Sequence, residues 1–297
     1  MHTMNIPAVK ETVSADVQEI FIQTQNGRKI GARIFKAHSA TSVVIIAGAM
    51  GVAQHCYEKF AKFLNDNGHH AITFDYFGYG QSIDRHVKHC NTDILEWGQQ
   101  DCNAVIQYAK THFNNVPVQW IGHSVGGQLM GMTSDFNQVT NAVTVACGSG
   151  YWRQNSPPTK RVVWLVWYIL TPILVPLLGY FPGKKLNIVG NLPGRVMKQW
   201  RRWALNKGYA VGAEGDAMQA QFDSVTVPIT SLSFSDDEMM SKENIDSLHS
   251  FYRGSDVNMV RVTPEQLGET FVGHLGWFRE KFKDSIWAGQ ILPLLKP

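Results

Sequence analysis

A serine lies between two glycines in the stretch "QWIGHSVGGQLMG", residues 119–131. The pattern Gly122-x-Ser124-x-Gly126 follows a short apolar run and precedes a segment that predicts a helix. A sharp strand-to-helix turn of this kind needs glycines, because a Cβ at either position would clash with neighbouring backbone. The pattern indicates that Ser124 attacks an acyl carbonyl; the alternative is a glycine-rich turn with an idle serine.

A serine hydroxyl is a weak nucleophile by itself, so this chemistry requires a base and an acid that orients the base. In the matching chain order, the acid follows a later strand and the histidine precedes the final helix. His274, in "FVGHLGWF", occupies the second place. The run "SDDEMMS" occupies the first, and there we prefer Asp237, with Asp236 as the alternative and Glu238 as a more distant one.

Two backbone N–H groups are also needed to stabilise the oxyanion that forms during acyl transfer. Val125, the residue after the serine, is expected to supply one. The second is expected from Ala49 or Met50, in "AGAMGV" after an apolar run, and the sequence does not distinguish these two. His123 is expected to shape the turn around the serine rather than to act as the base.

The elements around these motifs alternate between strands and helices. An Asn-Gly turn between two apolar segments predicts a hairpin over residues 17–35. Further strands are predicted in the apolar runs 116–122 and 141–150, and strands that lead into loops within 41–51 and 70–82, with helices at 56–68 and 93–113. The alternation predicts an α/β fold with a mostly parallel sheet and helices on both faces.

Residues 151–215 interrupt this alternation, which resumes at 225–238 with a strand that ends in acids. The apolar run 162–181 is nearly long enough to span a membrane, but two prolines interrupt it, and a span would place the sheet's strands on opposite sides of a bilayer. We therefore expect a hydrophobic lid inserted into one catalytic domain, which consists of 1–150 and 216–297. Contact between the lid and a membrane surface stays open.

Three aromatic residues of this expected lid, Trp164, Trp167 and Tyr168, are candidates for the wall of an apolar acyl pocket. The equally weighted alternative is that they pack against the catalytic domain.

Composition narrows the function classes. The hydrophobic content is 44% and the net charge is +3 without a long basic run, so a folded protein is expected and nucleic-acid binding is not. Four cysteines lack a CxxC or metal-like spacing, which predicts reduced, buried thiols in a cytoplasmic protein. The first 20 residues lack the pattern of a secretory signal. The expected chemistry requires neither a metal nor an organic cofactor.

Together these motifs resemble the α/β-hydrolase superfamily almost from end to end. The segment "DYFGYGQS" (75–82) is similar to its D-x-x-G-x-G-x-S segment, "GHSVGG" to its nucleophile elbow, and "GHLGWF" to its histidine loop. With "AGAMGV", Trp97 and Asp101, the chain resembles a bacterial group of predicted hydrolases near the serine aminopeptidase-like and monoacylglycerol lipase-like members. The loop "AGAMG" departs from the His-Gly-Gly of many esterases, which leaves the oxyanion donor open.

The resemblance implies the α/β-hydrolase fold and a serine hydrolase that cleaves a small-molecule acyl ester through an acyl-enzyme, in the manner of a carboxylesterase or lipase. Serine in place of aspartate speaks against dehalogenase and epoxide hydrolase chemistry. Three alternatives remain: an acyltransferase with the same triad, an aminopeptidase-like peptidase, and a binding protein without catalysis. The peptidase would need an acidic pocket, and the region around the lid offers few acids beyond Glu214 and Asp216.

Overall fold

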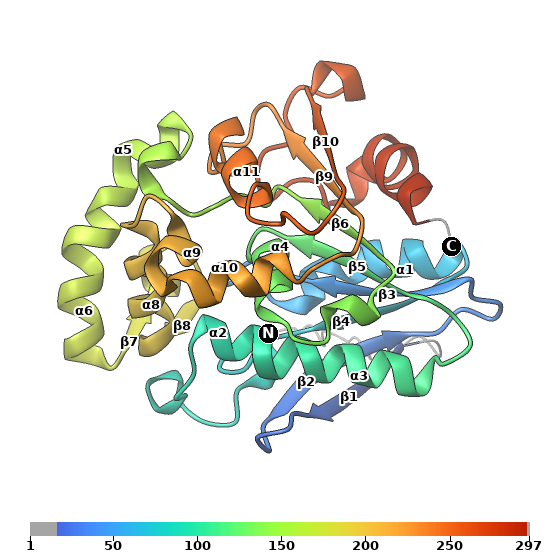
Figure 1. Ribbon diagram of the computed structural model, residues 1–297, viewed down its shortest axis with the longest axis horizontal. Coiled ribbons are helices and arrows are strands. Elements are labelled where there is room, and N and C mark those ends of the chain that lie inside the picture. Colours follow the sequence, from blue (N-terminus) through green and yellow to red (C-terminus); the bar gives the residue numbers. More distant parts are fainter. Residues whose placement is uncertain (1–16, 296–297) are drawn as a thin grey trace, which may run out of the picture.

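The structure is a computed structural model that describes residues 17–295 (Figure 1), so most of the segment considered above for a secretory signal lies outside the described residues. An eight-stranded sheet runs through the molecule in the order β1-β2-β4-β3-β5-β6-β9-β10. The strands are β1 (Val17–Gln23), β2 (Lys29–Phe35), β3 (Ser42–Ala47), β4 (His69–Phe74), β5 (Val118–His123), β6 (Asn141–Val145), β9 (Ile229–Phe234) and β10 (Val257–Val262).

The pairing of these strands confirms the predicted, mostly parallel sheet. Strands β1, β2 and β4 pair antiparallel, and every pair from β4 to β10 is parallel. All residues of β3 and β5 are buried, which agrees with the apolar run in β3; β5 buries Gln119 and His123 as well. The carboxyl ends of the parallel strands meet at one edge of the sheet, where ligands bind in α/β folds.

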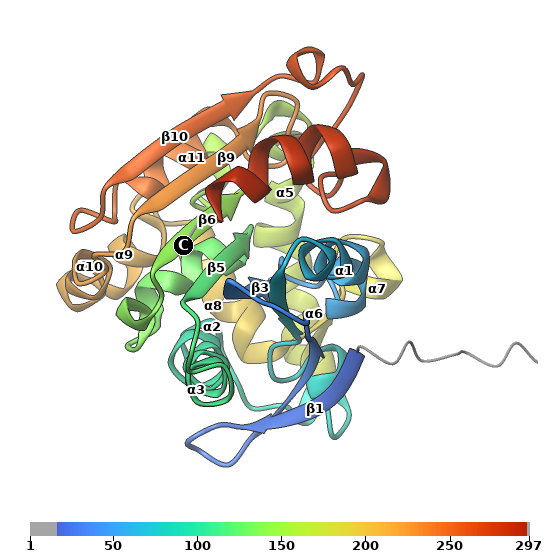
Figure 2. The same cartoon turned by 90° about the vertical axis from the view of Figure 1, so that its right-hand side faces the viewer.

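Helices cover both faces of the sheet (Figure 2). On one face lie α2 (Ile94–Glu96), a π-helical turn (Trp97–Cys102), α3 (Asn103–His112), α10 (Asp216–Asp223) and α11 (Lys242–His249). On the other face, α1 (Glu58–Asp66) packs with helical turns near the C-terminus, Glu280–Phe282, Lys283–Ile291 and Leu292–Leu294. Aromatic side chains join these two elements, since Trp287 lies 5.4 Å from Phe60, centroid to centroid.

The part of the chain between β6 and α10 forms the group of elements at the left of Figure 1. It contains α5 (Pro157–Leu165), a π-helical turn (Val166–Leu170), α6 (Thr171–Leu178), β7 (Tyr180–Pro182), α7 (Gly183–Leu186), β8 (Asn191–Pro193), α8 (Gly194–Ala204) and α9 (Tyr209–Glu214). From α5 to α6 the chain is one helix of 22 residues, Pro157–Leu178, which is long and apolar enough to cross a membrane by length and composition alone.

Proline explains the π-helical turn in this helix. The N–H of Thr171 bonds to the carbonyl of Val166, five residues earlier. The next bond in that pattern would come from residue 172, but Pro172 has no N–H. The Arg201 guanidinium of α8 donates to the Trp167 carbonyl instead, at 2.5 Å, which ties the helix to α8.

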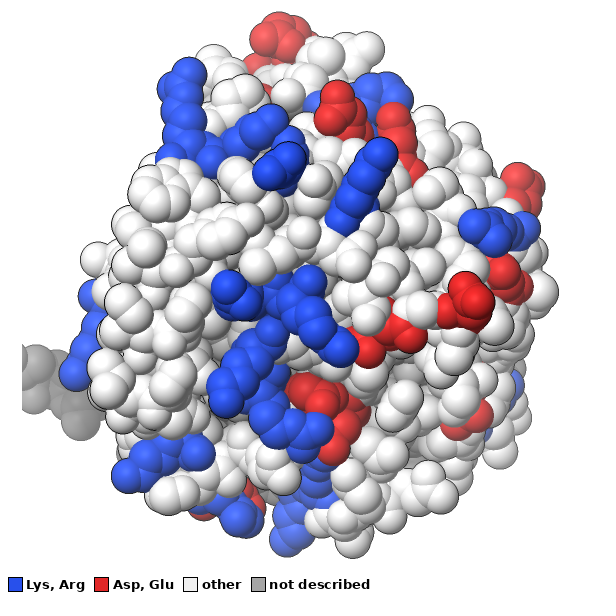
Figure 3. All heavy atoms as spheres, turned by 60° about the vertical axis from the view of Figure 1, so that its left-hand side comes forward, with Lys and Arg blue, Asp and Glu red and all other residues white. Residues whose placement is uncertain are grey.

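Charge is distributed unevenly along the chain. Residues 151–215 carry ten Lys and Arg side chains and one acidic side chain, Glu214, while the rest carries 17 basic and 23 acidic side chains. Figure 3 shows the resulting surface, in which basic side chains border a broad uncharged area and most of the acidic ones lie to its right.

Two sequence predictions need correction. The cysteines were expected to be buried, but Cys56 is exposed, because it belongs to a short turn (Gln54–Tyr57) before α1 and not to its inner face. The helix after Ser124 is short: α4 (Val125–Gln128) passes into a 3₁₀ turn (Leu129–Met132).

Candidate active site

Ser124 lies in the sharp turn between β5 and α4, with φ 54° and ψ −111°, a conformation that is strained for a residue with a side chain. The turn depends on its glycines. A Cβ on Gly126 would lie 2.1 Å from the Ala47 carbonyl oxygen, and one on Gly122 would lie 2.6 Å from the Gly127 nitrogen. The predicted reason for both glycines is therefore visible in the structure.

The structure brings Ser124, His274 and Asp237 together. The His274 Nε2 lies 3.0 Å from the Ser124 Oγ, and its Nδ1 lies 2.8 Å from the Asp237 Oδ2. All three residues are buried and follow the carboxyl ends of β5, β10 and β9, respectively. With Nδ1–H donating to the carboxylate, Nε2 is free to accept the serine proton.

The Asp237 carboxylate is itself held in place. Its Oδ1 accepts hydrogen bonds from the N–H groups of Met239 and Met240, both at 2.8 Å. Its carbonyl accepts the Ser156 hydroxyl at 2.7 Å. The side chain therefore has one oxygen for its own loop and one for the imidazole.

The two neighbouring acids hold the histidine loop. The Asp236 Oδ2 accepts the N–H groups of Val272 and Gly273, at 2.7 and 3.1 Å. The Glu238 Oε2 accepts the backbone N–H of His274 at 2.9 Å. Of the three acids considered from the sequence, only Asp237 contacts the imidazole, while Asp236 and Glu238 contact the backbone that carries it.

The environment of His274 shifts its pKa in two directions. Burial alone would lower the pKa, because the charged imidazolium loses its hydration. The Asp237 carboxylate, with a smaller contribution from Glu238, outweighs burial and raises the pKa of His274 above its ordinary value. A raised pKa makes the imidazole a better proton acceptor, which suits a general base.

Tyr57 distinguishes the two candidate oxyanion donors. The Ala49 N–H donates to the Tyr57 hydroxyl at 2.9 Å, so this amide is already occupied. Within residues 17–295 the Met50 N–H has no hydrogen-bond acceptor. Met50 and Val125 both line the pocket next to Ser124.

The same tyrosine connects this loop to the histidine loop through His123. The Tyr57 hydroxyl lies 2.7 Å from the His123 Nδ1, and the His123 Nε2 lies 3.0 Å from the His274 carbonyl. Burial, with a smaller effect of His274, holds the pKa of His123 well below its ordinary value. A neutral His123 accepts from Tyr57 and donates to the carbonyl, so its nitrogens are both occupied and it supports the turn, as expected.

Sequence reasoning missed the role of Tyr57. It belongs to the predicted helix 56–68, where a tyrosine at helical spacing looks like any other core aromatic. The structure places it just before α1, fully buried, with its hydroxyl between two functional loops.

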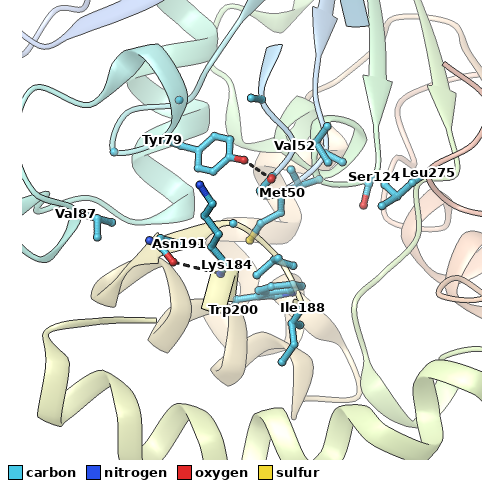
Figure 4. A pocket seen from close by; sticks show the side chains of 18 of the residues that line it. Met50, Val52, Tyr79, Val87, Ser124, Lys184, Ile188, Asn191, Trp200 and Leu275 are labelled. Atoms are coloured by element: carbon cyan, nitrogen blue, oxygen red, sulfur yellow. Dashed lines mark hydrogen bonds between the residues drawn. The ribbon is translucent and has the colours of Figure 1, made fainter. Parts of the chain in front are cut away.

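A pocket of about 830 Å³ opens from Ser124 and His274 (Figure 4). Ser124 and Leu275 lie at one end in this view and Val87 at the other. Its walls come from the loops after β3 and β4 and from the segment between β6 and β9, which contributes residues 187–191, Lys184 and Trp200. No Asp or Glu lines it.

The three aromatic residues predicted to wall this pocket lie elsewhere. Trp167 is buried against Trp200 of α8, with ring centroids 5.0 Å apart, so Trp200 stands between it and the pocket. Trp164 and Tyr168 point outward and are 46% and 48% exposed. Periodicity identifies the faces of a helix but not which neighbour each face meets.

Trp97 and Asp101 fix the segment 75–82, which borders the pocket. The Asp101 Oδ2 accepts the Phe77 N–H at 2.8 Å, and the Trp97 indole donates to the Phe77 carbonyl at 3.0 Å. Burial raises the pKa of Asp101 to about 7, against the opposing effects of the hydrogen bond from the Phe77 N–H and of Arg28.

In the described chain, no three His, Cys, Asp or Glu side chains cluster closely enough to hold a metal ion.

A mostly parallel sheet, a strained turn after β5 that carries a serine, and a histidine loop after the last strand define the α/β-hydrolase fold, here in the class with a serine at the nucleophile position. The family model described as "Serine aminopeptidase, S33" matches residues 37–187, half of the chain, including the serine turn. The chain therefore belongs to this family and is an enzyme, a serine hydrolase.

Solved structures confirm the fold. The chain is similar to a soluble variant of monoglyceride lipase from Saccharomyces cerevisiae bound to a substrate analogue, with 14% identity, 86% of this chain and 89% of that one covered, and a TM-score of 0.62. It is similar to an esterase from Pyrococcus furiosus, with 13% identity, 97% of this chain and 95% of that one covered, and a TM-score of 0.59. It is also similar to the esterase domain of a Rhodothermus marinus protein, with 14% identity, 93% of this chain and 95% of that one covered, and a TM-score of 0.58. No curated protein matches the sequence significantly.

Proposed function

We propose that the protein hydrolyses carboxylic esters with an apolar acyl chain. The observation that carries this proposal is the hydrogen-bonded chain from Ser124 through His274 to Asp237 at the end of the 830 Å³ pocket. The similarity to esterases and a monoglyceride lipase supports the same chemistry.

In the proposed mechanism, His274 takes the proton of Ser124 as the serine oxygen attacks the acyl carbonyl. The amides of Val125 and Met50 stabilise the oxyanion, and Asp237 stabilises the imidazolium. His274 then gives the proton to the leaving alcohol. In the second half, His274 takes a proton from water as the water oxygen attacks the acyl-enzyme. His274 then returns this proton to the Ser124 oxygen as the acid is released.

The pocket lining favours an ester over a peptide substrate. An aminopeptidase holds the positively charged terminal amine of its substrate, which requires a carboxylate, and no Asp or Glu lines this pocket. Apolar side chains outnumber polar ones in its lining, as expected for an acyl chain. We further propose that residues 151–215 act as a lid on the catalytic domain, because Trp200 and residues 187–191 form part of the pocket wall.

A panel of p-nitrophenyl esters of increasing chain length tests the substrate class. Each methylene buried in the pocket contributes about 0.8 kcal/mol, so kcat/KM should rise by up to about fourfold per methylene until the pocket is filled. A kcat/KM that falls steadily beyond the acetate ester would rule out an acyl pocket. Acyl transfer to added alcohols that outpaces hydrolysis would identify an acyltransferase instead.

The Ser124→Ala variant tests the nucleophile. It should lose about 10⁶-fold in kcat and all labelling by a fluorophosphonate probe, because no other group can form the acyl-enzyme. Ser250→Ala is the matched control: this exposed serine at the end of α11 should keep wild-type labelling and rate. Hydrolysis by Ser124→Ala at the wild-type rate would refute the assignment.

A further inference from the structure

The outer face of helix Pro157–Leu178 is the largest concentration of exposed apolar side chains in the described chain. Of the 15 large hydrophobic residues that are exposed in residues 17–295, eight lie on this helix. They follow each other at helical spacing along one side. The six most exposed are Val162, Trp164, Tyr168, Ile169, Ile173 and Leu177, with 42% to 75% of their surface accessible.

The opposite face of the same helix packs into the protein. Val166, Trp167, Thr171 and Val175 are buried, and the Arg201 guanidinium bonds to the Trp167 carbonyl. The helix is therefore a fixed part of the molecule with one side turned to solvent. Contiguous apolar surface of this kind marks a site of contact with a protein or a membrane.

Charge around the outer face indicates the kind of partner. Lys160 and Arg161 near its start and Lys184 and Lys185 beyond its end are exposed, and none of them forms an ion pair within the described residues. The whole segment 151–215 carries ten basic side chains against one acid, which is paired with Arg202. In Figure 3 the basic side chains surround uncharged surface.

We propose that this outer face docks on a bilayer that contains anionic phospholipids, with the helix axis parallel to the membrane surface. An apolar face bordered by Lys and Arg is the pattern of helices that lie in the membrane interface. Anionic headgroups attract each nearby basic side chain, and Trp and Tyr favour the level of the headgroups.

Two other arrangements fit the charges and contacts less well. A second copy of the chain on this face would bring two strongly basic segments together, which is unfavourable. A helix that spans the bilayer would have to leave α8, which would expose Trp167 and Val175 and break the bond from Arg201. Docking parallel to the surface keeps every one of these contacts.

The docked helix would lead to the pocket. Tyr180, two residues beyond the helix, packs edge-to-face against His86 with ring centroids 5.3 Å apart, and His86 lines the pocket. Ile188 also lines the pocket and is 45% exposed. The end of the outer face is thus continuous with the pocket rim, where an acyl chain could pass from the membrane to Ser124.

Vesicle sedimentation with the full chain tests the docking. We expect binding to phosphatidylcholine vesicles with about 30 mol% phosphatidylglycerol to exceed binding to pure phosphatidylcholine by at least about tenfold. The difference should shrink when salt rises from about 0.1 M to about 0.5 M. Lys160→Gln with Arg161→Gln should reduce the preference for phosphatidylglycerol. Equal binding to both vesicle types, or none, would overturn the proposal.

The double variant Ile173→Ser, Leu177→Ser tests the face itself and should bind at least about tenfold more weakly. Phe21→Ser is the matched control, because this side chain on β1 is 66% exposed but lies outside the outer face. Activity of the double variant on a water-soluble ester within about twofold of wild type shows that it is folded, since neither residue contacts the site. Unchanged binding by the double variant would overturn the proposal.

The alternatives give distinct results. Protein that stays in the membrane after alkaline carbonate extraction would indicate a spanning helix. A dimer that forms without lipid and that the double variant abolishes would indicate a second copy of the chain on the outer face. Either result overturns the proposal. The docking does not depend on the proposed ester hydrolysis. Ser124→Ala should bind vesicles like the wild type even though it is inactive, so the two hypotheses fail separately.

Discussion

Two loops reach Ser124 from different strands, and they are held in different ways. The loop after β9 uses its own side chains: Asp237 bonds to the imidazole, while Asp236 and Glu238 bond to backbone N–H groups of the histidine loop. The loop after β3 presents backbone amides, and a side chain from outside it, that of Tyr57, holds one of them.

The difference determines where a substitution has its effect. In the loop after β9, the functional atoms belong to the residues themselves, so changing a carboxylate removes its hydrogen bonds directly. In the loop after β3, the functional atoms are N–H groups that almost any residue provides. We therefore expect the proposed activity to depend most on Tyr57, which is buried and lies outside the loop.

The largest expected effect separates Asp237 from its neighbour. Asp237→Asn should lower kcat by about 10⁴-fold, because an amide neither fixes the Nδ1–H tautomer of His274 nor stabilises the imidazolium. Asp236→Asn is the matched control. Its amide oxygen still accepts the N–H groups of Val272 and Gly273, so kcat should fall by less than about tenfold. Steady-state hydrolysis of a p-nitrophenyl ester measures both, and the reverse order would assign the acid to Asp236.

Tyr57→Phe should have the next largest effect, about a 10- to 100-fold loss in kcat with little change in KM. Loss of a whole oxyanion donor costs about 10²- to 10³-fold, and here the Met50 amide is displaced, not removed. The variant also leaves the Ala49 N–H and the His123 Nδ1 without partners, at a cost of about 1–3 kcal/mol for each buried group.

Tyr252→Phe is the control for this prediction. Tyr252 is equally buried, and its hydroxyl donates to the Gly127 carbonyl at 2.5 Å and accepts the Gly131 N–H at 3.3 Å, with no bond to the loop after β3. Urea unfolding should show a similar loss of stability for both variants, while only Tyr57→Phe loses kcat. Equal losses of kcat would mean that Tyr57 contributes packing alone.

The sequence predicted the parts of the site in which chemistry restricts the residue type. Buried strands are continuous apolar runs, so the order of strands and helices could be derived, and with it the places of Ser124, Asp237 and His274. The same pattern placed Val125 and offered Ala49 and Met50. Choosing between these two required the hydroxyl of Tyr57, whose position depends on how α1 packs against the sheet.

The segment 151–215 shows where sequence reasoning ends. Its apolar run led to the prediction of a hydrophobic lid, but not to which of its residues face inward. Trp164 and Tyr168 were candidates for the pocket wall and instead point outward, while Trp200 of α8, which had not been considered, lines the pocket. The prolines and the π-helical turn change the helical phase between α5 and α6, so spacing alone could not assign these faces.

The smallest expected effect concerns the pH dependence and the third acid. Hydrolysis requires neutral His274, so kcat/KM falls as pH drops through the pKa of His274, which lies above its ordinary value because of Asp237 and, to a smaller extent, Glu238. Glu238→Gln removes one of these charges but keeps an oxygen that accepts the His274 N–H. The acidic limb of the profile, measured between about pH 5 and pH 9, should therefore move to lower pH while the plateau stays nearly unchanged. If the acidic limb of the kcat/KM profile does not shift, Glu238 acts on His274 only through its hydrogen bond to the backbone. If kcat/KM on the plateau is lost, the charge of Glu238 is needed to hold the histidine loop.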